Sequence, residues 1–375
     1  MVIFLVKRII MFSITSALLV KGIILSIIIH FTARPILAFF RQLLIAQLLG
    51  IRSLLKDYQD LRHHRFLEAT QEQFNHNGNT YRTKMMGADS IFTIDPDNIR
   101  TLLAVKFDHY SVGRRRGDAF IPYMGHSIIS ADGEAWARSR QLLRSSFTLR
   151  QADLAIFEKH VGHMLQAIPS NCIAIDLQPV FFHLAMDIAS EFFLGESTDC
   201  LAPEKLKSSS VEFSERFSQF QCAIRDRLCL GKFPILAPTV AFHRNRRYIR
   251  EFVDNFIEKA SFAQRQRESE RLDSTGKHNF LIDKLTRSPK NAIELREDVL
   301  HLFLGARDTT GSLLSNLWFV LARRPDIWEK LYREVLALGR GRPLLEQLKG
   351  MKYMHCCIKE CTSVHDINRA LSDPA

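Results

Sequence analysis

The hydrophobic pattern divides the chain into a continuous apolar start and a longer body with helical periodicity. Ile9–Phe31 is an apolar run of 23 residues, broken by one charge at Lys21. A helix of that length spans roughly 35 Å, which is enough to cross a hydrocarbon core of about 30 Å. The run is long for a cleaved signal peptide, the alternative reading, and no clear cleavage pattern follows it. We therefore expect a retained membrane anchor over residues 1–34.

The next segment, residues 35–51, stays apolar but is interrupted at helical spacing by Arg41, Gln42 and Gln47. This pattern is typical of an amphipathic helix that lies on a bilayer surface. Packing of the same apolar face against a globular domain is an equally good interpretation. We expect a membrane-proximal segment here, followed by one globular domain over residues 52–375.

From residue 52 the pattern predicts a mainly α fold with a small β region. Alternation over Thr80–Met86 and Ser90–Ile94 indicates a β-hairpin. Apolar positions at helical spacing predict helices over most of the chain after residue 134, including a long one from residue 294 to 322. We expect residues 111–134 to form a loop, because they are rich in glycine and arginine. The polar stretch 263–279 indicates an exposed linker or loop.

Two local patterns predict where helices begin. Asp95 followed by Pro96 is a good N-cap and first helical residue. Asp132 before Gly133 is a plausible cap for a helix that carries Trp136.

Composition and charge narrow the class of protein. The 375 residues are 46% hydrophobic with 7 cysteines, which excludes a disordered chain and a small disulfide scaffold. The net charge is +11, and the first 50 residues hold five basic side chains and no acidic one. Residues 151–375 are nearly balanced, with 31 basic and 29 acidic side chains. The excess charge therefore flanks the apolar start, which favours a membrane surface over nucleic acid as the partner.

The most informative motif lies in the middle of the long helix predicted from residue 294. Gly305 and Ala306 are small, so a large flat group could approach the backbone of an otherwise apolar, buried helix. Asp308 beside Thr309 places an acid next to an alcohol, which suits a proton relay. The alternative is a kink in a core helix, since threonine hydroxyls can bond to backbone carbonyls and bend the helix.

A second pair, Trp136 and Arg140, lies four residues apart and so shares one helix face. An indole N–H and a guanidinium aimed together suit a carboxylate. Taken alone, a surface arginine beside a core tryptophan explains the pair better.

Together these motifs resemble those of the cytochrome P-450 family, the haem-thiolate monooxygenases. The sequence Gly-Ala-Arg-Asp-Thr-Thr at 305–310 is similar to the oxygen-activating segment of that family, although the second position is more often glycine. The Trp-x-x-x-Arg pattern at 136–140 resembles the helix that binds the haem propionates. The sequence segments around residues 93–99, 110–116 and 132–136 are similar to those of the fungal branch of the family that hydroxylates alkanes and fatty acids.

The resemblance implies the cytochrome P-450 fold and haem as cofactor, with Trp136, Arg140, Gly305 and Ala306 at the haem. Thr309 would hydrogen-bond the bound oxygen and Asp308 would help deliver protons. The reaction would use O2, an apolar substrate such as an alkane or fatty acid, and electrons from NADPH through a membrane-bound reductase. The protein would be anchored in the endoplasmic reticulum membrane with a cytosolic catalytic domain. We expect no nucleic-acid partner, because the charge is nearly balanced over the folded part and the basic residues do not alternate with aromatic ones.

The same resemblance implies that family motifs expected near the C-terminus are missing from this sequence. Glu360 matches the glutamate of the family's Glu-x-x-Arg pair, but Ser363 stands at the arginine position. No cysteine lies in the Gly-x-Arg-x-Cys setting that supplies the proximal iron ligand. We therefore expect a C-terminally truncated member that is inactive as written and has no protein metal ligand.

Two alternatives remain open at this stage. The first is a membrane-anchored helical remnant that binds no haem and catalyses nothing. The second is a metal site, because Cys357, Cys361 and His365 fall on one helix face. Structural zinc normally takes four ligands from a bent chain, which makes the metal site the weaker alternative.

Overall fold

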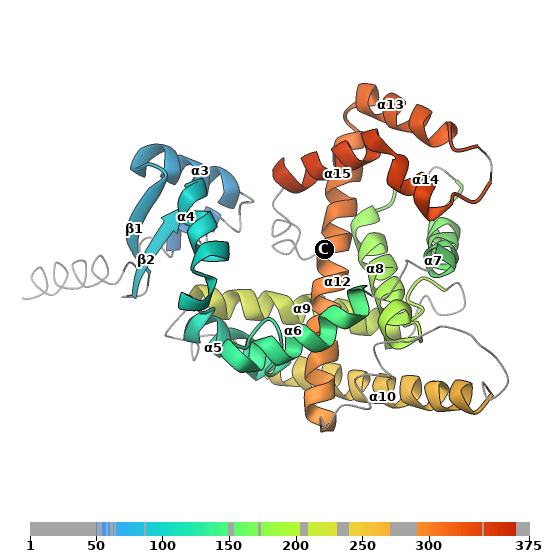
Figure 1. The fold of residues 1–375 in the computed structure, drawn as a ribbon, viewed down its shortest axis with the longest axis horizontal. Coiled ribbons are helices and arrows are strands. Elements are labelled where there is room, and N and C mark those ends of the chain that lie inside the picture. The colour runs from blue at the N-terminus through green and yellow to red at the C-terminus, as the bar shows by residue number, and fades with distance from the viewer. Residues whose placement is uncertain are drawn as a thin grey trace, which may run out of the picture. The chain divides into compact units, whose positions relative to one another are not determined.

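A computed structural model gives the fold (Figure 1). The chain divides into two compact units, Met1–Ile99 and Arg100–Ala375. The structure describes residues 50, 55–57, 59–60, 63, 65–85, 88–148, 154–171, 174–202, 209–230, 240–270, 291–339 and 341–364.

The first unit contains the helix α3 (Phe66–Asn77) and an antiparallel hairpin of β1 (Thr80–Met85) and β2 (Ala88–Thr93). Tyr81 pairs with Phe92 across the hairpin, and their rings stack 5.4 Å apart. The predicted hairpin is confirmed, although β2 starts two residues earlier than expected. The helix α4 (Pro96–Arg100) follows, and the predicted Asp95 cap is confirmed because its Oδ1 accepts from the N–H of Asp97 and of Asn98.

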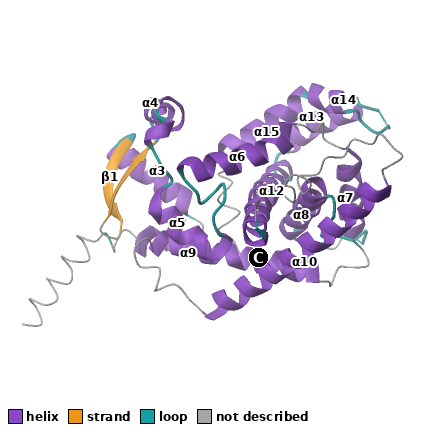
Figure 2. Cartoon of the chain, turned by 60° about the horizontal axis from the view of Figure 1, so that its bottom comes forward, coloured by secondary structure: helices purple, strands orange, loops and turns teal. Residues whose placement is uncertain are grey.

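The described residues of the second unit form helices joined by loops, with no strand among them (Figure 2). Two short turns open it, the π-helix η1 (Thr101–Val105) and the 3-10 helix η2 (Phe107–His109). The α-helices that follow are α5 (Gly113–Met124), α6 (Gly133–Thr148), α7 (Leu154–Ala167), α8 (Leu177–Leu194), α9 (Ser209–Leu230), α10 (Val240–Glu270), α12 (Ala292–Leu321), α13 (Pro325–Leu336), α14 (Leu345–Gly350) and α15 (Lys352–Val364).

The long helix α12 organises this unit, with α8 packed along it (Figure 1). Asn291 caps its first turn by accepting from the N–H of Glu294 at 2.9 Å. The close packing has a local cause at Gly311, where a Cβ atom would lie 2.7 Å from the Phe182 ring. The core beside α12 contains Phe213, Phe217 and Phe220 of α9, each with no more than 1% of its surface exposed. The prediction of a mainly α fold with a small β region is confirmed.

Two sequence predictions need correction. Residues 113–124, predicted as loop, form α5, because Ala119, Phe120, Tyr123 and Met124 recur at helical spacing and are buried. The predicted linker at 263–279 begins within α10, which continues to residue 270, and the rest of that stretch lies outside the described residues.

The predicted cap at Asp132 serves a different helix from the one expected. Its two carboxylate oxygens accept from the N–H of Val112 at 2.8 Å and of Gly113 at 3.1 Å. Asp132 therefore satisfies the start of α5, about twenty residues earlier, and not the start of α6. This long-range contact is one reason why a glycine- and arginine-rich stretch is helical.

The predicted anchor and most of the membrane-proximal segment lie outside the described residues. Among the helices that the structure does describe, none combines the length and apolar character needed to cross a bilayer.

Candidate functional site

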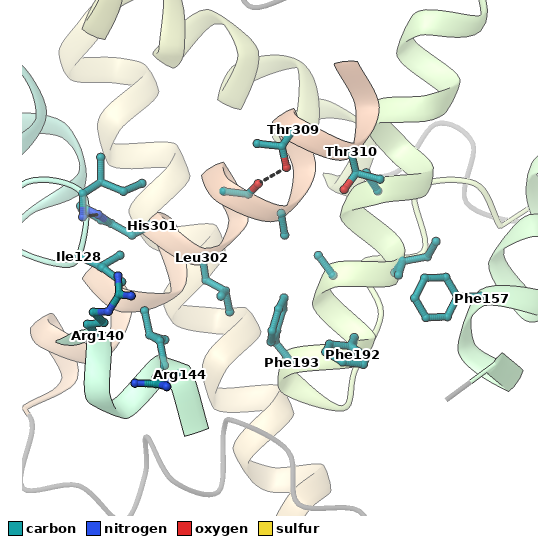
Figure 3. Close-up of a pocket in the computed structure, with 17 residues that line it drawn as sticks. Ile128, Arg140, Arg144, Phe157, Phe192, Phe193, His301, Leu302, Thr309 and Thr310 are labelled. Atoms are coloured by element: carbon teal, nitrogen blue, oxygen red, sulfur yellow. Dashed lines mark hydrogen bonds between the residues drawn. The ribbon is translucent and has the colours of Figure 1, made fainter. Parts of the chain in front are cut away.

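The middle of α12 forms one wall of a cavity of about 760 Å³ in the second unit (Figure 3). Helices α6, α7 and α8 and the segment between α5 and α6 form the other walls. Figure 3 shows two arginines at one end of the cavity and Phe157 at the other. The lining residues are Ile128, Ile129, Arg140, Leu143, Arg144, Phe157, Ala185, Ile188, Ala189, Phe192, Phe193, His301, Leu302, Gly305, Ala306, Thr309 and Thr310.

Gly305, Ala306 and Thr309 were predicted site residues, and the structure brings all three to the cavity. A Cβ atom on Gly305 would meet nothing within 4 Å, so the space beside this turn of the helix is open. The Thr309 hydroxyl donates to the Gly305 carbonyl oxygen at 2.7 Å, which leaves its lone pairs available as an acceptor (Figure 3). The predicted bond from a threonine hydroxyl to the helix backbone is therefore present, and it occurs inside the cavity.

Arg140 also lines the cavity, whereas its predicted partner Trp136 does not. The Arg140 guanidinium lies 5.1 Å from the centre of the Trp136 ring, and that ring packs against Phe107. Trp136 therefore contacts the arginine through a cation–π interaction, and its part in carboxylate binding stays a prediction. Arg144, one helical turn further along α6, brings a second guanidinium to the cavity.

Asp308 is not among the cavity-lining residues, because adjacent positions on a helix face different directions. It is 2% exposed and pairs with Arg307, whose Nη1 lies 2.7 Å from its Oδ1. The Gln221 amide of α9 donates to its other oxygen. Burial raises the pKa of the Asp308 carboxyl, while Arg307 and Gln221 lower it in part. The structure thus separates the acid from the alcohol that the sequence pairs with it.

Arg307 is itself 3% exposed and is surrounded by α8 and α9. Its Nη2 donates to the Ser218 hydroxyl at 2.7 Å and to the Ser214 hydroxyl at 3.3 Å. Its guanidinium lies 4.6 Å from the centre of the Phe182 ring. The motif therefore serves two purposes, since one face of α12 lines the cavity and another ties three helices together.

A short segment between α5 and α6, residues 125–131, is tied to the first half of α12. We call it the wall loop, because its Ile128 and Ile129 line the cavity. The Ser127 hydroxyl donates to Asp298 Oδ1 at 2.7 Å, and the N–H of Ile129 donates to His301 Nδ1 at 3.2 Å.

Gly125 opens the wall loop with a φ of +76°, and a Cβ atom there would lie 1.9 Å from Glu297 Cδ. We expect Gly125→Ala to lower the free energy of unfolding by about 1–2 kcal/mol, because alanine is strained at positive φ and displaces the carboxylate that accepts from the His126 N–H. Urea unfolding monitored by circular dichroism measures this change in the free energy of unfolding.

Gly162→Ala in α7 is the matched control, because a Cβ atom there meets nothing within 4 Å. We expect it to raise the free energy of unfolding by about 0.5–1 kcal/mol, as alanine replaces glycine inside a helix. Equal effects of the two substitutions would contradict the proposed strain at Gly125.

Sequence reasoning missed three features of the site. Arg144 could have been found, because it lies four residues after Arg140 on the same helix. The wall-loop isoleucines and His301 had no local signal, since their roles depend on contacts between segments more than 170 residues apart. Glu360, a predicted remnant of a family motif, lies exposed on α15 and does not line the cavity.

The metal alternative gains no support from the part of the chain that is described. No group of three or more His, Cys, Asp or Glu side chains there could hold a metal ion. His365, one of the three proposed ligands, lies outside the described residues.

Comparison with known proteins shows to which family this chain belongs. The sequence model of the cytochrome P450 family matches residues 50–368, which include every cavity-lining residue. The chain belongs to the cytochrome P450 family. Membership confirms the resemblance found in the motifs.

The curated relatives are fungal cytochrome P450 proteins. The chain is 31% identical to a cytochrome P450 monooxygenase of Fusarium heterosporum over 372 residues, 94% of this chain and 65% of that protein. It is 35% identical to a cytochrome P450 monooxygenase of Fusarium mangiferae, over 84% of this chain and 62% of the relative. Cytochrome P450 52A9 of Candida maltosa is 31% identical, with shares of 76% and 57%. The chain thus spans less than two thirds of the length of these relatives.

The family implies a haem cofactor, and the cavity of this cytochrome P450 fits the porphyrin part of that group. Two guanidiniums at one end match the two propionate carboxylates, and the rest of the lining is mostly apolar. The open space at Gly305 admits a flat ring beside the helix. The described cysteines, at 200, 222, 356, 357 and 361, do not line the cavity, so these walls supply no thiolate for the iron.

Proposed function

We propose that the chain acts as a haem-dependent monooxygenase on an apolar substrate such as an alkane or a fatty acid, with the thiolate ligand of the iron supplied from outside the cavity walls described above. The observation that carries this proposal is the cavity, which combines arginines at one end with an apolar lining and small residues on α12. When bound, haem supplies the activation of O2 for insertion of an oxygen atom into a C–H bond. Electrons would come from NADPH through a cytochrome P450 reductase.

Arg140 and Arg144 would bind and orient the cofactor through its carboxylates. Both guanidiniums are permanently charged and solvent-exposed, so each can form a charge-assisted hydrogen bond to a carboxylate at this end of the cavity. Trp136, which does not itself line the cavity, contacts the Arg140 guanidinium through a cation–π interaction. Phe192 and Phe193 would contact an apolar chain at the other end of the cavity.

Thr309 is the residue that would hold a proton at the reacting centre. Its Oγ1 lies in the cavity and already donates to the Gly305 carbonyl, so the same oxygen can accept a hydrogen bond from a bound molecule. Asp308 would supply protons only after its carboxyl turns away from Arg307 and Gln221. We propose that this turn, and not the resting arrangement, connects Asp308 with Thr309.

Association with the endoplasmic reticulum membrane is also part of the proposal. The apolar run Ile9–Phe31 in the sequence supports it, together with the basic residues on either side. Attachment to the same membrane would bring the protein together with a membrane-bound reductase and with apolar substrates.

The experiment is turnover by the purified full chain reconstituted with haem, NADPH and a fungal reductase. Dodecane and lauric acid are the substrates, and mass spectrometry identifies the products. A hydroxylated product that requires NADPH and falls strongly in Thr309→Ala supports the proposal. Haem uptake without any hydroxylated product from either substrate would overturn the proposed reaction.

A further inference from the structure

The wall loop is held to α12 by three hydrogen bonds. His126 N–H, the Ser127 hydroxyl and Ile129 N–H each donate to a side chain of α12. The three acceptors, on Glu297, Asp298 and His301, follow the helix over little more than one turn. The loop is thereby fixed to the same helix that carries the site motif.

The hydrogen bond to His301 differs from the other two because both of its residues line the cavity. His301 lines the cavity as well as bonding the loop, and the residue that it bonds, Ile129, lines the cavity too. Glu297 and Asp298 do not line it. In Figure 3 the His301 and Ile128 side chains are drawn at the same end as Arg140.

The hydrogen bond also defines the form of the imidazole. His301 is 1% exposed, and burial lowers its pKa to about 4, although the backbone carbonyls of Gly125 and Met124 act in the other direction. At neutral pH the ring therefore carries one proton. Because Nδ1 accepts from the Ile129 N–H, the proton is assigned to Nε2, which is buried and has no hydrogen-bond partner among the described residues.

We infer that His301 is a positioning residue that fixes Ile128 and Ile129 as a wall of the cavity and so determines the shape of the apolar ligand it accepts. An isoleucine wall selects shape only if its backbone cannot move, and a buried backbone N–H without a partner would favour another loop conformation. The inference extends the proposed function, but it concerns the cavity of the protein itself and does not require turnover.

The substitutions His301→Asn and His301→Leu form a matched pair. Asparagine keeps an acceptor near the position of Nδ1, whereas leucine has similar bulk and no acceptor. His160→Asn is the control, because His160 is a fully buried histidine of α7 that bonds Glu191 and does not line the cavity. Circular dichroism checks that each variant folds.

The first measurement is amide hydrogen exchange of residues 125–131 in the full chain without haem. We expect His301→Leu to increase exchange at Ile129 at least about tenfold, in line with the loss of one hydrogen bond. His301→Asn and the His160 control should stay close to the wild type. Equal exchange in His301→Leu and the wild type would overturn the inference.

The second measurement is binding of cis-parinaric acid, a fluorescent fatty acid, to the same haem-free proteins. We expect His301→Leu to weaken binding about tenfold and His301→Asn to weaken it about twofold or less. Equal weakening by both variants would show that the ring and not the hydrogen bond matters, and would contradict the inference. If His301→Leu does not fold, Ser127→Ala tests the same wall and is expected to increase exchange across residues 125–131. Unchanged exchange in that variant would also contradict the inference.

These outcomes are distinct from those of the turnover experiment. A chain that hydroxylates neither substrate would still show the His301→Leu changes if the inference is correct. A chain that hydroxylates both could still show unchanged exchange and binding, which would remove the inference and leave the proposed function intact.

Discussion

Replacing Arg307 with leucine is expected to lower the free energy of unfolding by about 3–5 kcal/mol at pH 7, one of the two largest effects that we expect. Arg307 and Asp308 form an ion pair with 3% and 2% of their surfaces exposed. Removal of the cation leaves a carboxylate in a site where water cannot reach it. The substitution also removes the contact with the Phe182 ring and leaves the Ser218 hydroxyl without its donor.

The double substitution Arg307→Leu with Asp308→Leu is the informative control. A buried ion pair can often be replaced by apolar residues with little net change, because both desolvation costs disappear together. We therefore expect the double variant to recover most of the loss seen in Arg307→Leu. Chemical unfolding of the three detergent-solubilised proteins gives the comparison. A single variant within about 1 kcal/mol of the wild type would show that the ion pair contributes little.

The second large effect is a loss of stability between pH 7 and pH 5 caused by two histidines, His301, which is buried, and His183, which is half-buried. Burial lowers the pKa of both His183 and His301 to about 4 in the folded protein, from 6.5 in a solvent-exposed histidine. Arg307 contributes to the lowering at His183. Between these values the unfolded chain binds a proton that the folded chain does not. Stability is therefore complete above pH 6.5 and falls as the pH decreases toward 4.

The expected size is about 2 kcal/mol per histidine at pH 5, since each pH unit below 6.5 contributes about 1.4 kcal/mol. Asp187 and Asp308 act in the opposite direction, because burial raises the pKa of each and the folded protein then binds the additional protons. A variant that retains both aspartates but carries His183→Asn and His301→Asn separates the two contributions.

Unfolding free energies at pH 7 and pH 5 give the result for the wild type and the double histidine variant. We expect the variant to lose about 4 kcal/mol less than the wild type over this interval. Parallel losses in the two proteins would mean that other groups cause the acid sensitivity.

The sequence predicted best those features that depend on neighbouring residues. The alternation around Tyr81 and Phe92 predicted the hairpin, and the apolar flanks of the motif predicted α12. Gly305, Ala306 and Thr309 were predicted to lie together because they share a short stretch of one helix. Family membership followed from the same local motifs.

The remaining features depend on contacts that sequence spacing does not encode. Helix α5 is capped by Asp132, which is about twenty residues away, so its glycine- and arginine-rich start read as loop. The pairing of Asp308 with Arg307 and Gln221 requires α9 to pack against α12. Acid and alcohol were expected to act side by side, but rotation along the helix directs them to different surroundings. The bond from Ile129 to His301 spans 172 residues.

The most direct test of the account is whether haem binds in the cavity beside Ala306. Ala306→Trp places an indole in the cavity, and Ala337→Trp places the same side chain on the exposed end of α13. Titration of the three purified proteins with haem, followed by the Soret band, compares them. We expect saturable binding of one haem by the wild type and by Ala337→Trp, and loss of binding in Ala306→Trp. Equal haem binding by Ala306→Trp and the wild type would contradict this expectation.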